Sequence, residues 1–219
     1  MPKLKHRRRR RPIRPPSPSL RFTPTAWAKL RFLRDRGPTE IGGFGLSAVD
    51  DPLLVIDLLL VRQRATPLTV AFDDGALADL FDQMVDRGVG PERCGRIWIH
   101  THPGNCARPS AVDDITFRRA FGGMDWAVMM ILARNEATCA RLAFHVGPGG
   151  VWEIPVAVNY SRPFAASDSA RWEQEYREQV QVEPFHFRNF PAAGEALPNN
   201  RTADPKGPLP YGGVAAEPL

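Results

Sequence analysis

Hydrophobic residues recur along the chain at spacings that alternate between those of helices and those of strands. Within residues 25–36, Trp27, Leu30 and Leu33 lie near the 3.6-residue period of a helix, and Gly37-Pro38 ends the segment. Helices are also predicted over residues 73–86, 110–121 and 167–180. Apolar runs predict strands over residues 40–46, 53–61, 68–72, 96–99, 126–133, 140–146 and 151–158.

The order of these elements indicates an α/β fold. Helices and strands are mixed over about 160 residues, with no repeat and no internal linker between them. We therefore expect a single-domain α-β sandwich over residues 25–183, in which helices flank a mixed sheet and a polar helix comes last.

Both ends of the chain differ in composition from this central part. Residues 1–24 contain six prolines and the run Arg7 to Arg11, and like charges and prolines oppose regular pairing, so we expect a disordered basic arm. Residues 184–219 contain seven prolines together with Tyr211-Gly212-Gly213, and we expect a disordered tail rich in proline and glycine.

Composition excludes several classes of protein. No apolar run approaches the roughly 18 residues of a membrane helix, so we expect no membrane partner. The basic N-terminus is not followed by the apolar stretch of a secretory signal peptide. Three cysteines cannot form a closed set of disulfides and suit a reducing compartment, so we expect a cytoplasmic protein.

The net charge of +5 is unevenly distributed. Residues 1–36 hold 13 of the 29 lysines and arginines but only one of the 24 acidic residues, so the rest of the chain is mildly acidic. One interpretation of the arm is electrostatic binding to nucleic acid or anionic lipid. The alternative is a solvated tail with at most weak, nonspecific nucleic-acid contact, because no aromatic residues interleave with the arginines.

Candidate chemistry is concentrated at the end of the strand predicted over residues 96–99. His100 and His102 are two positions apart, so an extended backbone directs both imidazoles to the same side, where they can bind one ion. Ser110 is a good N-cap for the following helix, and Asp113 then falls in its first turn. Two imidazoles and one carboxylate are typical of catalytic zinc, which keeps its fourth position for water.

Such a centre also needs a base and an oxyanion partner. Glu40 is the best candidate for the base, because the glycines at 42 and 43 allow a substrate or another backbone to approach closely. The Ser110 hydroxyl could stabilise the oxyanion. Each residue also has a plainer explanation: Glu40 as a solvated carboxylate at a strand edge, Ser110 as a helix cap only.

Two neighbouring residues compete for metal ligation. Asp114 is also close to the helix start and is the alternative to Asp113. Cys106 lies in the loop between the ligands, where its thiolate could occupy the open position or remain an uninvolved thiol. Trp98 and Ile99 are expected in the hydrophobic core.

The spacing His-x-His, seven residues, Ser, two residues, Asp resembles the JAMM (MPN or JAB) metalloprotease motif without a gap, and Glu40 resembles that family's catalytic glutamate. The resemblance covers roughly residues 25–160 and implies a JAB/MPN fold, with a layout similar to that of cytidine deaminases. It implies His100, His102 and Asp113 as ligands of one Zn²⁺ per chain, Glu40 as general acid/base and Ser110 as the oxyanion-stabilising serine.

The resemblance further implies a zinc-dependent isopeptidase or peptidase that cleaves after the C-terminal glycine of a ubiquitin-like protein, for deconjugation or maturation. The substrate and partner would be that ubiquitin-like protein or its conjugate. Two alternatives stay open: trimming of a sulfur-carrier protein, and a non-catalytic module that binds a modifier or nucleic acid.

Overall fold

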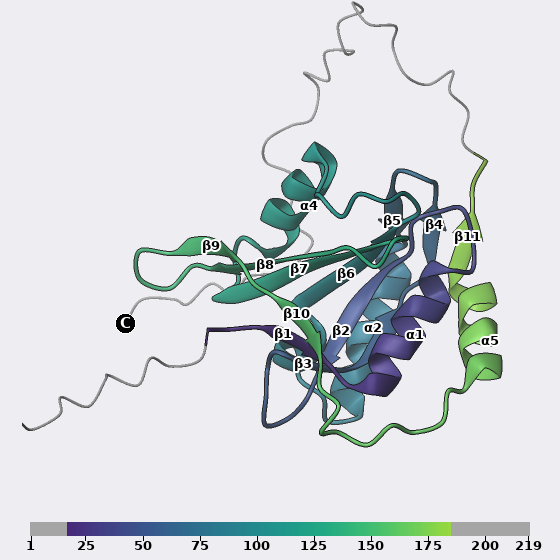
Figure 1. Ribbon diagram of the computed structural model, residues 1–219. Helices are drawn as coiled ribbons and strands as arrows, with labels where there is room; N and C mark the ends of the chain where they lie inside the picture. Colours follow the sequence, from purple (N-terminus) through teal and green to yellow (C-terminus); the bar gives the residue numbers. More distant parts are fainter. Residues whose placement is uncertain (1–16, 185–219) are drawn as a thin grey trace, which may run out of the picture. The chain divides into compact units, whose positions relative to one another are not determined.

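Eight strands form one mixed sheet in the computed structural model, which describes residues 17–184 (Figure 1). In spatial order they are β10 (Val156–Val158), β1 (Leu20–Phe22), β3 (Leu54–Leu60), β2 (Gly42–Ser47), β6 (Ile97–His102), β7 (Trp126–Ala133), β8 (Thr138–Phe144) and β9 (Gly150–Glu153). Strand β1 is parallel to β10 and β3, and β6 is parallel to β7, whereas the other neighbours are antiparallel. The predicted mixed sheet is confirmed.

A second, smaller sheet and five helices complete the described part of the chain. The sheet has the order β11 (Val180–Val182), β4 (Gln63–Ala65) and β5 (Val70–Phe72). The helices are α1 (Pro24–Arg34), α2 (Asp74–Asp86), α3 (Pro91–Cys94), α4 (Ala111–Phe121) and α5 (Ser169–Gln179). None of those formed by residues 17–184 combines the length and the apolar character that a membrane crossing requires.

Strand β6 divides its side chains between two hydrophobic clusters because side chains alternate along an extended backbone. Ile97 and Ile99 join the cluster that contains Leu30 and Leu33 of α1. Trp98 joins the other cluster, which contains aromatic residues of α2 and α4. Helix α5 packs alongside α1 (Figure 1), so helices cover both faces of the sheet, as expected for an α/β sandwich.

The N-terminal boundary of the domain is earlier than the sequence predicted. Leu20 and Phe22 are fully buried in β1, which lies between β10 and β3, and Thr23 caps α1. The expectation of disorder up to residue 24 is therefore wrong for residues 20–24. Three residues flanked by prolines and arginines carry too weak a compositional signal, and their burial depends on strands distant in sequence. Residues 1–16 of the predicted arm lie outside the described residues.

Other differences concern short elements. Residues 151–158 form β9 and β10 rather than one strand, because Pro155 has no backbone N–H to donate to a ladder. Strands β4 and β11 and helix α3 were not predicted, since each has only three or four residues. Of the predicted tail over residues 184–219, all but Pro184 lies outside the described residues.

Candidate metal centre

The two histidines lie where β6 ends, on the same side of the strand. His100 is 1% exposed, and the side chain of His102 is 13% exposed. Their ring centres are 5.2 Å apart. The predicted convergence of the two imidazoles is therefore confirmed, and its cause is the two-residue period of the strand.

Asp113 reaches the histidines from the first turn of α4. The Ser110 Oγ accepts a hydrogen bond from the Asp113 backbone N–H at 3.1 Å, and the Ser110 backbone N–H donates to Asp113 Oδ2 at 2.7 Å. This capping box holds the carboxylate at the positive end of the helix. Asp113 Oδ1 then lies 3.4 Å from His100 Nε2, and Oδ2 lies 3.8 Å from His102 Nε2.

Glu40 is brought to the same point by the antiparallel pairing of β2 with β6. The register places Gly42 opposite His100. Beyond it, Ile41 and Thr101 exchange two hydrogen bonds, one from the Ile41 N–H to Thr101 Oγ1 at 3.0 Å and one from the Thr101 N–H to the Ile41 carbonyl at 2.9 Å. Glu40 therefore faces His102.

Gln63 is a residue near the site that the sequence analysis missed. The residue is 1% exposed, and its side-chain amide accepts from the Gly42 N–H and donates to the Gly42 carbonyl, each at 2.8 Å. These two bonds satisfy the backbone N–H and carbonyl of Gly42, as a neighbouring strand otherwise would. Gly42 begins β2 and is two residues from Glu40. A polar residue in a three-residue strand gives no signal in the sequence that would have identified it.

The two glycines after Glu40 allow protein segments to pack closely. A Cβ at Gly43 would lie 2.5 Å from the backbone carbonyl oxygen of Leu59 on β3. A Cβ at Gly42 would lie 3.0 Å from side-chain atoms of Val70 and Phe72 on β5. Of the two uses expected for these glycines, the structure shows the close approach of other parts of the chain.

Burial and neighbouring charges shift the two carboxyl groups in opposite directions. Burial raises the pKa of Glu40 to about 8; His102 opposes this shift and the negative charge of Asp113 adds to it. Burial also acts to raise the pKa of Asp113, but His100, His102 and the Ser110 amide hold that pKa well below its usual range. Asp113 is therefore the ionised member of the pair at neutral pH.

The histidines also differ from each other. Burial lowers the pKa of His100, which favours the neutral imidazole that metals bind. For His102, burial lowers the pKa, but the nearby Asp113 carboxylate and the hydrogen bond to the Cys106 carbonyl outweigh it and raise the pKa. His102 Nδ1 lies 2.8 Å from that carbonyl oxygen, which can only accept, so in the neutral ring Nδ1 carries the proton and Nε2 has the lone pair that a metal binds.

The residues present fit a metal ion. One ligand atom from each of His100, His102 and Asp113 lies within 4.8 Å of the others, on buried or half-buried side chains. Among residues 17–184, both ring nitrogens of His100 and Nε2 of His102 are buried without a hydrogen-bond partner. Buried polar atoms normally have partners, so nitrogens without one at the centre of a ligand set indicate that this group could bind a metal ion.

The structure also separates the competing candidates. Asp114 turns away from the cluster and forms an ion pair with Arg141 at 2.8 Å, so Asp113 is the aspartate of the centre. Cys106 is exposed. It contacts the cluster through its backbone carbonyl, which accepts a hydrogen bond from His102, rather than through its thiol.

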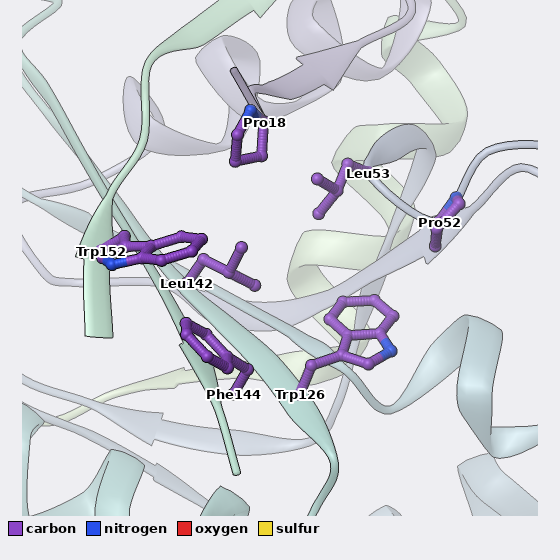
Figure 2. Close-up of a pocket in the computed structure, with 7 residues that line it drawn as sticks. All are labelled: Pro18, Pro52, Leu53, Trp126, Leu142, Phe144 and Trp152. Atoms are coloured by element: carbon purple, nitrogen blue, oxygen red, sulfur yellow. The ribbon is translucent and has the colours of Figure 1, made fainter. Parts of the chain in front are cut away.

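A separate apolar cavity of about 440 Å³ lies at the other end of β7 (Figure 2). Trp126, which lines it, begins β7, whereas Ala133, which pairs with His102, ends that strand. Seven residue steps correspond to roughly 20 Å along a strand. The cavity is therefore not part of the metal centre. Its lining consists of Pro18, Pro52, Leu53, Trp126, Leu142, Phe144 and Trp152.

No protein-family model matches the chain, and no curated protein matches it. The chemistry that the centre can perform therefore follows from its own residues: two imidazoles and a carboxylate to hold a cation, a second carboxyl group beside them and a hydroxyl at the helix cap.

Proposed function

We propose that the protein is a zinc-dependent isopeptidase or peptidase of the JAMM type, with the JAB/MPN fold. The observation that carries the proposal is the position of Glu40, whose Oε1 lies 3.7 Å from His102 Nε2 at the edge of the ligand set. A carboxyl group there can contact a water held by the metal, as a hydrolase requires and a purely structural metal site does not.

Zinc suits the donor set better than other common ions. Two imidazole nitrogens and one carboxylate are typical ligands of catalytic zinc, whereas calcium and magnesium prefer oxygen ligands. A zinc ion held by His100, His102 and Asp113 would lower the pKa of a coordinated water and polarise the carbonyl of the scissile bond. We propose one ion per chain.

Glu40 would move the proton in this reaction. The positive charge of a bound zinc ion would favour the ionised form of Glu40, opposing the effect of burial. In that form its carboxylate would accept a proton from the attacking water and return it to the departing amine, acting first as general base and then as general acid. Glu40 is 7% exposed, which limits exchange of that proton with bulk water. Its backbone N–H donates to the Thr66 carbonyl at 2.9 Å, and this bond helps to fix the segment that carries it.

Ser110 would stabilise the developing oxyanion. Its Oγ uses a lone pair to accept from the Asp113 N–H, which leaves the hydroxyl proton free to be donated. The side chain lies on an exposed residue at the start of α4, where a substrate can reach it.

The proposed substrate is a ubiquitin-like protein joined through its C-terminal glycine to an amine. The support for this class is the spacing of the motif and its resemblance to JAMM proteases. The decisive experiment incubates the purified protein with ubiquitin-like proteins carrying a C-terminal extension or an isopeptide-linked lysine. Cleavage after the terminal glycine that stops on chelation and returns with Zn²⁺ supports the proposal. Binding without cleavage by the zinc-loaded protein would instead indicate a recognition module.

A further inference from the structure

The two metal-binding histidines are held in different ways. His102 donates from Nδ1 to the Cys106 carbonyl, the type of bond that normally orients a metal-ligating imidazole. His100 has no such bond, because its Nδ1 is buried without a partner in the described part of the chain. Something other than a hydrogen bond must therefore orient its ring.

Trp98 contacts the His100 ring directly. The two ring centres are 4.5 Å apart and the planes are inclined by 29°, which is a stacked arrangement. Both residues point to the same side of β6, since they are two positions apart. Stacking of aromatic rings at this distance is favourable beyond simple burial, so it favours one orientation of the His100 ring over others.

The indole is itself held by α4, the helix that carries Asp113. Phe117 and Phe121 stack against Trp98 with ring centres 6.5 and 6.3 Å away. All three aromatic side chains are at least nine-tenths buried. Trp98 thus lies between one metal ligand, His100, and the helix that supplies another.

A hydrogen bond from the indole N–H does not explain why tryptophan occupies position 98. Its Nε1 is buried and has no hydrogen-bond acceptor within residues 17–184. A buried N–H without an acceptor costs free energy, so the stabilising contribution of the side chain comes from its ring. A different aromatic ring should therefore substitute for it better than an aliphatic side chain.

We propose that Trp98 is a positioning residue of the metal centre: it orients the His100 imidazole by stacking, as the Cys106 carbonyl orients His102. The inference rests on the metal binding within the proposed function and is independent of peptide hydrolysis. Loss of a group that orients a ligand typically lowers metal affinity about 10- to 100-fold.

The test is titration of the metal-free protein with Co²⁺, whose visible absorption reports both affinity and ligand geometry. Trp98→Met should bind Co²⁺ at least about 10-fold more weakly than wild type and with an altered spectrum. Trp98→Phe should retain affinity within about 3-fold and the wild-type band shape, because it keeps an aromatic ring. Trp98→Ile, with a side chain suited to strands, replaces Trp98→Met if that variant does not fold.

Phe81→Leu is the matched control. It loosens the same cluster at α2, where Phe81 packs edge-on against Phe44, so it should lower thermal stability while metal affinity stays near wild type. Wild-type affinity in Trp98→Met, or equal losses in Trp98→Met and Phe81→Leu, would overturn the inference. A wild-type protein that binds neither Co²⁺ nor Zn²⁺ would overturn the proposed function as well.

Discussion

Glu40 and His102 are 62 positions apart in the sequence, yet Glu40 Oε1 lies 3.7 Å from His102 Nε2. The antiparallel pairing of β2 with β6 produces this contact, and its register is held by the hydrogen bonds between Ile41 and Thr101. A shift of one residue would turn the Glu40 side chain to the opposite face of the sheet. The site therefore depends on strand register as much as on the metal-binding residues.

Removing one imidazole should abolish tight metal binding. We expect the wild-type protein to hold one zinc per chain and His100→Ala to lose most of it, because two ligands rarely hold zinc tightly. Metal analysis of chelator-free preparations measures this directly. His145→Ala is the control, since His145 bonds the Met124 carbonyl away from the cluster and should leave the zinc content unchanged. Equal zinc content in both variants would contradict the assignment of His100.

Chelation should destabilise the wild-type protein more than it destabilises His100→Ala. Metal that binds only the folded state stabilises it by mass action, so its removal lowers the Tm. Without metal, the buried His100 nitrogens also have no hydrogen-bond partner in the part of the chain that the structure describes, which costs free energy. Thermal unfolding with and without chelator checks this expectation, and identical shifts in the two proteins would show that no metal is held at this centre.

Adjacent aspartates should behave differently. Asp113→Asn removes a charged ligand and should lower zinc affinity by at least about 10-fold, whereas Asp114→Asn should leave it near wild type. Asp114 pairs with Arg141, and half-exposed ion pairs contribute only about 0–1 kcal/mol, so the stability of Asp114→Asn should change little. Competition with a coloured chelator measures both affinities. The reverse ranking would mean that Asp114 supplies the ligand.

Glu40→Gln should separate binding from turnover. Glutamine keeps the size of the side chain but cannot accept a proton, so zinc content should persist while turnover falls about 10²- to 10⁴-fold. Glu153→Gln, on the exposed edge strand β9, is the control and should cleave at the wild-type rate. Cleavage by zinc-loaded Glu40→Gln at the wild-type rate would assign the base to another residue.

Ser110 should contribute to both stability and turnover. Ser110→Ala loses the N-cap of α4, which should reduce the free energy of unfolding by about 1 kcal/mol. Turnover should fall about 10²-fold or more with zinc retained if the hydroxyl also stabilises the oxyanion. Ser110→Thr keeps a capping hydroxyl and should recover most of both losses. Loss of stability with unchanged turnover would leave Ser110 as a cap only.

Two N-terminal deletions should have opposite effects. Removing residues 1–16 leaves β1 in place, so the fold and the zinc content should be retained. Removing residues 1–23 deletes Leu20 and Phe22, both fully buried between β10 and β3, and should prevent stable folding. Circular dichroism and thermal unfolding distinguish these outcomes. Any nucleic-acid binding by the arm should disappear with residues 1–16 and weaken steeply with salt.

Local patterns in the sequence were sufficient to predict most helices and strands and to identify the three candidate metal ligands. The alternation along β6 and the cap at Ser110 act within a few residues, so spacing alone predicts where the side chains of His100, His102 and Asp113 converge. The same local chemistry places α2 after the cap at Asp73 and the long strand β7 at residues 126–133. These features required no knowledge of distant contacts.

Pairing between strands that are distant in sequence determines the contacts that residue spacing could not predict. The face presented by Glu40, the amide of Gln63 against Gly42 and the burial of β1 all depend on which strands become neighbours and in which register. The packing of Trp98 against Phe117 and Phe121 also depends on the position of α4 over the strand. Such contacts depend on the free energy of packing the whole domain. The residues of one short segment do not determine that free energy.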